Sequence, residues 1–250
     1  MPYDSAVMPR EAKRCDREKW NLQMHEQRYE SPQSLAMIHT VVGLIPELES
    51  LARDHLPDWR VFNMLDESLL RVTIRDGSVS AMTTRRLTGM IWSAVDAGAE
   101  AVLVTCSSLG RAVERIAPLC PVPLIRIDEG MAREAVARGD RIGVLATLQT
   151  TLTPTVELIE RVSREAGADR NISSQVVGGA FETLQSGDRE GHDARVAEGI
   201  AKLARENDVV VLAQASMARA LSRLEPRADD PPVLTSPALG VAHVARLLSR

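Results

Sequence analysis

Eight short aliphatic runs, separated by segments of helical spacing, constrain the fold of this chain more than any other feature. The runs are continuous rather than alternating, which is typical of strands that are covered on both faces. They lie at residues 35–42, 60–65, 100–105, 122–127, 141–146, 174–178, 208–213 and 232–235. Strands that alternate with helices predict a parallel α/β sheet. Aromatic residues make up only 3% of the sequence, so we expect an aliphatic core.

Apolar residues recur at helical spacing between these runs. They predict helices over 43–56 and 152–166, in which leucine, valine and isoleucine side chains share one face. Two further helices are expected at 108–117 and 193–206. Gly98 follows another predicted helix and stands where a glycine in the left-handed conformation commonly ends one.

A weak internal repeat relates the two halves of the sequence. GAEAVLVTCSSLGRAVERI (98–116) matches NDVVVLAQASMARALSRL (207–224) in hydrophobic pattern, and a shift of 108 residues places Cys106 on Gln214. Any two strand–helix units share some pattern, and this is the alternative explanation. We interpret the match as two Rossmann-like parallel-sheet halves related by a pseudo-twofold axis. The active site is then expected in the cleft between them, at the carboxyl ends of the strands.

The sequence divides into three predicted parts. Residues 1–34 form a charged N-terminal extension with six acidic and six basic residues. Residues 35–118 together with 225–250 form the first α/β lobe, and residues 119–224 form the second. The extension is either a mobile or peripheral segment, a helical arm that packs on a partner subunit, or the result of a translation start placed too early.

Composition excludes several classes of protein. The net charge is −4, from 30 basic and 34 acidic residues that are well mixed, so no basic face for nucleic acid is expected. Three cysteines are too few for a disulfide framework. No apolar run approaches the roughly 20 residues of a membrane helix, and the polar N-terminus does not resemble a signal peptide. We therefore expect a cytoplasmic globular protein.

Motifs for common cofactors and metals are absent. The sequence has no GxGxxG after its first strand, no GxxxxGK[ST], no GxSxG, no HExxH and no CxxC. No lysine stands at the end of a predicted strand, where a pyridoxal Schiff base would need one. We expect neither a cofactor nor a bound metal.

A cysteine stands at the most informative strand end. Cys106 closes a predicted strand and precedes a predicted helix, where the helix dipole is expected to lower the pKa of the thiol. A thiolate there can act as a general base or as a nucleophile. The neighbouring Ser107 and Ser108 could then bind a substrate. The alternative is a buried structural cysteine followed by two N-capping serines.

Hydroxyl groups gather at other strand ends. Thr147, Thr150 and Thr151 lie between a predicted strand and a predicted helix, where hydroxyls and free N–H groups bind anions well. A helix N-cap with extra turn hydroxyls is the alternative. His39 ends the first strand and is either a substrate contact or a hydrogen-bonded structural residue.

Three motifs in order resemble the aspartate/glutamate/hydantoin racemase superfamily over roughly residues 36–250. They are GAEAVLVTCSSLG, RIGVLATLQTTLTPT and VVVLAQASMAR. The resemblance implies that Cys106 is the family's first catalytic cysteine and that Thr147 and Thr150 occupy its substrate-binding positions. The third motif resembles the turn that carries the second cysteine, and it contains Ser216 and Met217 as expected substrate contacts. In this sequence, however, Gln214 occupies the second cysteine's position.

The family's activity, as the resemblance implies it, needs no cofactor. Two cysteines face opposite sides of a substrate carbon, one removing a proton and the other returning one. An amide can neither accept nor donate this proton, so Gln214 departs from two-base racemisation. A family branch that decarboxylates malonates works with one cysteine, which lies in the other half.

We therefore predict a cofactor-independent, racemase-like isomerase that acts on a small carboxylate. The Cys106 thiolate would act through an enolate-like intermediate, with Gln214 on the opposite face. The alternatives are a decarboxylase or lyase of the same superfamily and a non-catalytic protein that binds a small acid. A regulatory or assembly protein that uses the charged extension also stays open. A homodimer or higher homo-oligomer is expected.

Overall fold

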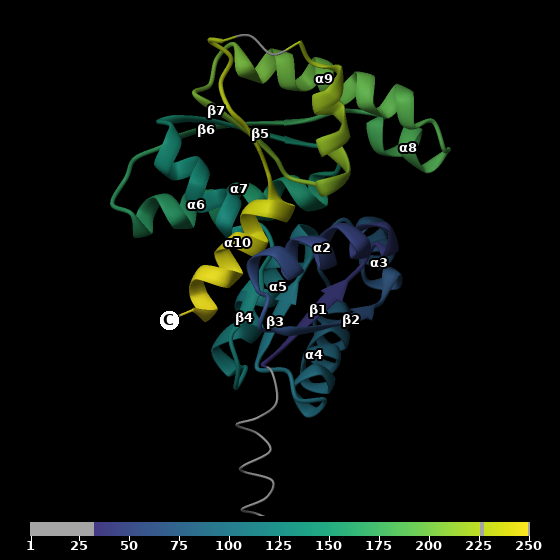
Figure 1. Ribbon diagram of the computed structural model, residues 1–250. Helices are drawn as coiled ribbons and strands as arrows, with labels where there is room; N and C mark the ends of the chain where they lie inside the picture. The colour runs from purple at the N-terminus through teal and green to yellow at the C-terminus, as the bar shows by residue number, and fades with distance from the viewer. Residues whose placement is uncertain (1–32, 226–227, 250) are drawn as a thin grey trace, which may run out of the picture. The chain divides into compact units, whose positions relative to one another are not determined.

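A computed structural model describes residues 33–225 and 228–249, and in this part of the chain the strands form two four-stranded parallel sheets (Figure 1). The first sheet has the order β2-β1-β3-β4 and the second the order β6-β5-β7-β8. The strands are β1 (Ser34–His39), β2 (Arg60–Leu65), β3 (Ala101–Val104), β4 (Leu124–Arg126), β5 (Arg141–Ala146), β6 (Asn171–Val176), β7 (Val209–Leu212) and β8 (Val233–Thr235). The predicted α/β fold of two similar parallel halves is confirmed.

Helices connect and cover these strands. The α-helices are α2 (Ile45–His55), α3 (Glu67–Asp76), α4 (Ala81–Asp96), α5 (Gly110–Ile116), α6 (Glu129–Arg138), α7 (Gln149–Glu165), α8 (Ala180–Gln185), α9 (Arg189–Ala204) and α10 (Ser236–Leu248). Short 3₁₀ segments are η1 (Val42–Leu44), η2 (Ser107–Leu109), η3 (Ala117–Leu119) and η4 (Ala215–Arg223). None of the helices described is long and apolar enough to cross a membrane.

Several helix boundaries differ from prediction. The helix expected at 108–117 is divided among η2, α5 and η3, because two 3₁₀ segments flank a short α-helix. The helix expected at 193–206 begins earlier, at Arg189, where the Asp188 side chain accepts from the Gly191 N–H and caps it. Gly98 has φ of +90° just after α4, as predicted for a helix-ending glycine.

Alternate residues of the strands enter different cores, which explains why the runs are continuous in sequence. In β1, Leu35 and Met37 pack with α2 and α10, whereas Ala36 and Ile38 pack with α3, α4 and α5. The second sheet is covered in the same way, by α6 and α7 on one face and by α9 and η4 on the other. These cores consist of leucine, isoleucine, valine, alanine and methionine, so the aliphatic core is confirmed.

The predicted lobe boundaries need correction at both crossings between the halves. β4 pairs with β3, so Leu124–Arg126 belongs to the first sheet, although it was predicted in the second lobe. β8 pairs with β7, so Val233–Thr235 belongs to the second sheet, although it was predicted in the first. Ser34 already begins β1, which shortens the predicted extension 1–34 by one residue. Residues 1–32 lie outside the described part of the chain.

One helix that follows each sheet packs in the core of the other sheet. α6 follows β4 of the first sheet, yet its Met131 and Ala135 pack in the core of the second sheet. α10 follows β8 of the second sheet, yet its Val241 and Val244 pack in the core of the first (Figure 1). The two helices also contact each other. Ser34–Arg250 is therefore one compact unit with two sheets.

Two glycines permit the close packing of these exchanged helices. A Cβ atom on Gly130 of α6 would overlap the carbonyl oxygen of Leu239, and one on Gly240 of α10 would overlap that of Ile127. Backbone cannot move aside as a flexible side chain can, so any larger residue at either position would push α6 and α10 apart.

A buried ion cluster ties β4 to the helix that follows β5. Arg126 ends β4, and its guanidinium binds both carboxylate oxygens of Asp128, with Nε–Oδ1 and Nη2–Oδ2 distances of 2.9 and 2.8 Å. It also donates to Glu114 of α5 at 2.6 Å and to the carbonyl oxygen of Pro154 in α7 at 3.2 Å. Gly110 leaves the space that the guanidinium occupies, since a Cβ there would overlap it. The cluster thus joins the two halves at the base of the predicted site.

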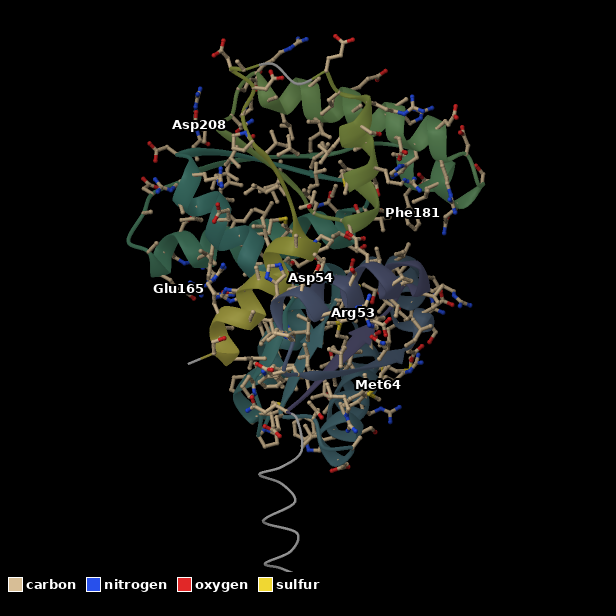
Figure 2. All side chains as sticks on the ribbon, in the orientation of Figure 1. Arg53, Asp54, Met64, Glu165, Phe181 and Asp208 are labelled. Atoms are coloured by element: carbon tan, nitrogen blue, oxygen red, sulfur yellow. The ribbon has the colours of Figure 1, made fainter. Side chains whose placement is uncertain are left out.

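Further ion pairs extend this cluster along α6 and α7. Arg161 donates to Glu129 and to Glu165, both at 2.6 Å, and Arg133 pairs with the same two carboxylates. Glu165 is labelled in Figure 2. These groups are more exposed than Arg126 and Asp128, so each pair contributes little by itself.

We predict that Arg126→Met lowers the free energy of unfolding by about 3–5 kcal/mol, because Asp128 has no exposed surface and no other partner among the described residues. Arg138→Met is the matched control: the exposed Arg138 pairs with Glu134 within α6, and its loss should cost no more than about 1 kcal/mol. Denaturant unfolding of the three proteins measures both values. Equal losses in the two variants would contradict a structural role for the cluster.

Candidate functional site

Cys106 lies where the first sheet presents the ends of two neighbouring strands. It is the second residue after β3 and the N-cap residue of η2, and its side chain is half-buried. Thr40 directly follows β1, which pairs with β3, and its hydroxyl hydrogen-bonds the Cys106 sulfur. The backbone N–H groups of Ser108 and Leu109 also face the sulfur and favour its thiolate, while the Leu109 N–H donates to the Cys106 carbonyl oxygen at 3.0 Å. Three donors therefore converge on one thiol.

Burial reverses the expected ionisation of this thiol. Desolvation raises the pKa of Cys106, and this effect outweighs the hydrogen bonds from Thr40, Ser108 and Leu109, which lower it. The nearby Asp128 carboxylate raises the pKa further. The prediction of a lowered pKa is wrong, because η2 is only three residues long and the penalty of burial for the charged thiolate is the larger effect. The resting form of Cys106 is the protonated thiol.

His39 is fully buried, and both of its ring nitrogens are engaged. Nε2 lies 2.9 Å from the side-chain oxygen of Asn63, and Nδ1 lies 3.0 Å from the hydroxyl of Thr105. Burial lowers the pKa of His39, although Asn63 and the Glu49 carboxylate act in the opposite direction. Neither ring nitrogen is free for a substrate, contrary to the predicted contact. The imidazole instead joins the ends of β1, β2 and β3.

Gln214 occupies in the second sheet the place that Cys106 occupies in the first. It is the second residue after β7 and the N-cap residue of η4. Its side-chain oxygen accepts from the backbone N–H of Thr147 at 2.6 Å and from the Thr147 hydroxyl at 3.0 Å. Thr147 follows β5 as Thr40 follows β1, so a threonine hydroxyl bonds the equivalent residue in each half. Among the described residues, the amide nitrogen of Gln214 has no hydrogen-bond partner.

Two hydroxyls that were expected to bind a substrate bind each other instead. The Ser108 and Thr151 oxygens lie 2.7 Å apart and are buried, and they join η2 of the first half to α7 of the second. Ser107 is also buried. This direct contact brings the segment after β3 and the segment after β5 together, as the predicted site between the halves requires.

Thr150 retains an unused hydroxyl at the start of α7. Its oxygen is buried and has no hydrogen-bond partner among the described residues. The N-cap position of α7 is Leu148, whose side chain cannot cap, so the first N–H groups of this helix have no side-chain acceptor. The predicted helix start at 152 is thus three residues late, and the three threonine hydroxyls do not cap the helix.

The remaining predicted contacts differ in accessibility. Met217 has no exposed surface and packs in the core with Val196 and Leu212, so the structure contradicts its predicted substrate contact. Ser216 is half-buried in η4. In the part of the chain that the structure describes, no cluster of three or more histidine, cysteine, aspartate or glutamate residues is placed to hold a metal ion.

Sequence reasoning missed the groups that surround Cys106 and His39. Thr40 follows His39 at the end of the first predicted strand, but it was not assigned as the partner of the thiol. Asn63 interrupts the aliphatic run VFNML, and this polar residue in a strand was the available signal. Glu49 carried no signal, because it looks like an ordinary surface residue of a helix. Only the tertiary fold brings it to Asn63, at 2.6 Å.

Arg86 is a second missed group. It reaches from α4 to the end of β2, where it donates to Asp66 at 2.5 Å and to the Ser68 hydroxyl at 2.7 Å. Asp66 caps α3 through the Ser68 N–H. A basic side chain from α4 therefore reaches the end of β2, a contact that was not predicted from the sequence.

The fold is similar to that of known racemases. A glutamate racemase from Francisella tularensis, solved with D-glutamate, aligns with a TM-score of 0.67 and 12% identity over 88% of this chain and 81% of its own. A glutamate racemase from Bacillus anthracis gives 0.64 and 14% over 88% and 82%. An allantoin racemase from Klebsiella pneumoniae gives 0.57 and 17% over 87% and 88%. At these identities the likeness establishes the fold alone.

Similarity in sequence is more distant. No curated protein sequence matches the chain. The sequence model of the Asp/Glu/hydantoin racemase family matches residues 37–244, which include both sheets, Cys106 and Gln214. The chain belongs to the Asp/Glu/hydantoin racemase family.

Proposed function

We propose that the protein is a cofactor-independent isomerase-type enzyme that moves one proton on a small carboxylate through the Cys106 thiol. The observation that carries the proposal is the environment of that thiol, with three hydrogen-bond donors around it at the end of β3. A purely structural cysteine needs no such donors, since a thiol behaves as a small apolar group. Membership of a racemase family supports the same chemistry.

The carboxylate of the substrate would bind at the start of α7. The uncapped N–H groups there and the unpartnered Thr150 hydroxyl are donors without acceptors. The amide N–H groups of Gln214 add two more donors, because its oxygen is held by Thr147. Such donors stabilise an enolate-like intermediate as negative charge develops on its oxygens.

Proton transfer would occur on one face only. Cys106 can give up or accept a proton, whereas the Gln214 amide can only donate hydrogen bonds. A single-face proton shift is therefore the isomerisation that these two residues support, and inversion at a carbon would need another acid or base.

Decarboxylation followed by reprotonation is a second candidate, and one observation favours it. Burial raises the pKa of Cys106, so the resting thiol holds a proton and is ready to donate it. Loss of carbon dioxide leaves an enolate that requires a proton donor on one face and no base on the other. Cys106 and Gln214 meet that requirement.

We expect Cys106→Ser to lower turnover by roughly 10²–10⁴-fold, because a serine hydroxyl is a far weaker acid than a thiol. Small carboxylates with an acidic α-hydrogen or a second carboxylate would be incubated in deuterated buffer and followed by NMR, which detects exchange, isomerisation and decarboxylation together. Cys120→Ser is the control, since Cys120 packs against the first-sheet core away from the strand end. Full activity in Cys106→Ser would exclude the thiol as the proton carrier.

We expect Gln214→Cys to create or raise α-proton exchange with solvent and loss of optical purity on a chiral acid, because it supplies a thiol at the second position. Gln214→Ser removes the amide without adding a thiol, and it should not gain exchange. Deuterium incorporation and optical rotation are the measurements. No gain in Gln214→Cys would contradict the placement of residues 106 and 214 on opposite faces of the substrate.

We expect the rate of Cys106 alkylation by iodoacetamide to rise with pH, with a midpoint above that of an ordinary cysteine. The thiolate is the reactive form, and it appears only as the pH passes the raised pKa of Cys106. Thr40→Val should move the midpoint upward by roughly one pH unit, because it removes a donor that favours the thiolate. Thr40→Ser keeps the hydroxyl and should match the parent protein. A midpoint below that of ordinary cysteine would contradict the dominance of burial.

A further inference from the structure

A network of polar side chains, buried at His39 and Thr105 and half-buried at Glu49 and Asn63, lies beside the cysteine. It consists of Glu49, Asn63, His39 and Thr105, hereafter the His39 network. The Asn63 amide nitrogen donates to Glu49 at 2.6 Å, and the Asn63 oxygen lies 2.9 Å from His39 Nε2. His39 Nδ1 lies 3.0 Å from the Thr105 hydroxyl. The network crosses β2, β1 and the end of β3 and stops one residue before Cys106.

The Glu49 carboxylate sets the direction of every hydrogen bond in the network. It borders a surface cavity of about 340 Å³, and an ionised carboxylate can only accept. The amide nitrogen of Asn63 must then face Glu49, so the Asn63 oxygen faces His39 and needs an N–H from Nε2. Neutral His39 is left with a lone pair on Nδ1. The Thr105 hydroxyl donates its single hydrogen to this lone pair at 3.0 Å rather than to the Ile38 carbonyl oxygen at 3.2 Å. A single tautomer, protonated at Nε2, satisfies all four side chains.

The network adjoins both residues of the Thr40–Cys106 pair, in which the Thr40 hydroxyl donates to the sulfur. Thr40 follows His39, and Cys106 follows Thr105. The bond from His39 to Thr105 therefore fixes the ends of β1 and β3 at the point where Thr40 and Cys106 leave them. Backbone bonds support this from both sides, since Thr105 N–H donates to the Ile38 oxygen and Asp66 N–H donates to the His39 oxygen, each at 3.0 Å.

The second half of the protein provides an internal comparison. Its strands β5 and β7 correspond to β1 and β3, so Ala146 stands for His39 and Ala213 for Thr105. Both alanines have no exposed surface and pack in the aliphatic core. The second half therefore holds its strand ends without any such network, and it carries Gln214 in place of the thiol. The network is present only in the half with the cysteine, so the fold itself does not require it.

We infer that Glu49, Asn63 and Thr105 are positioning residues for Cys106: through one tautomer of His39 they fix the distance between the Thr40 hydroxyl and the sulfur. The inference rests on the proposed role of Cys106 in proton transfer. Its test does not require turnover, because the tautomer of His39 and the ionisation of Cys106 can each be measured without a substrate.

Histidine NMR tests the direction of the hydrogen bonds in the His39 network. Long-range ¹H–¹⁵N spectra of the full-length protein at neutral pH report the protonation of each ring nitrogen, and His39→Gln identifies the His39 signals by their loss. We expect the Nε2-protonated tautomer in the parent protein. In Glu49→Gln either end of the new amide can face Asn63, so Asn63 can present its oxygen or its nitrogen to His39. Both His39 tautomers are then populated, and the two His39 nitrogen shifts should approach each other. Glu47→Gln, the same change at an exposed position of α2, should leave them unchanged.

Alkylation of Cys106 tests the effect on the thiol. Thr105→Val removes the hydroxyl that joins His39 to β3, and we expect the pH midpoint of alkylation to rise by roughly half to one pH unit. Thr105→Ser restores the hydroxyl and should restore the midpoint, which loss of packing alone would not explain. Peptide mass spectrometry separates Cys106 from Cys120, and circular dichroism verifies folding.

Several outcomes would contradict the inference. An Nδ1-protonated or doubly protonated His39 in the parent protein, or unchanged His39 shifts in Glu49→Gln, would overturn the assigned direction. A parental alkylation midpoint in folded Thr105→Val would overturn the positioning role. If these measurements succeed while Cys106→Ser keeps full turnover, the proposed function fails and the positioning of the thiol stands.

Discussion

The exchange of α6 and α10 between the halves is the constraint on which the rest of the structure depends. Each helix follows a strand of one sheet and fills the core of the other, so neither half has a complete core by itself. Their backbones approach so closely that only glycine fits at residues 130 and 240. Because this contact fixes the two halves against each other, η2 and α7 can meet through Ser108 and Thr151. The site is a consequence of that exchange.

The Cys106 environment shows why local sequence rules cannot fix the charge of a residue. A thiol at a helix start is expected to ionise easily, and the N–H groups of Ser108 and Leu109 do favour the thiolate. However, η2 is a single 3₁₀ turn, and burial penalises the charged form of the thiol. Desolvation grows with tertiary packing, whereas the dipole of so short a segment is small. The balance therefore favours the protonated thiol, which suits a proton donor better than a base.

The fold was largely predictable from the sequence, and the boundaries between the halves were not. Continuous aliphatic runs located the strands because buried parallel strands must be apolar on both faces. The same signal could not assign β4 and β8 to a sheet, since the chain crosses between halves after each of them. The equivalent positions of Cys106 and Gln214 followed from the repeat. Met217 did not, because a residue next to a turn can face the core as easily as the site. Glu49 could not be found at all, since its role depends on a contact with a distant strand.

The pseudo-twofold repeat makes the differences between the halves more informative than their similarity. Thr40 and Thr147 are equivalent, and each bonds the residue that follows the equivalent strand, a thiol in one half and an amide in the other. In the first half the bonded atom can change its charge, so its surroundings must be held within a fraction of an ångström for the hydrogen bond to matter. In the second half the amide stays neutral, and two bonds from Thr147 already fix its orientation. Cys106 therefore has a polar network beside it, because its ionisable sulfur must be positioned. Gln214 has alanines at the equivalent places, because burying polar groups there would cost free energy without a benefit.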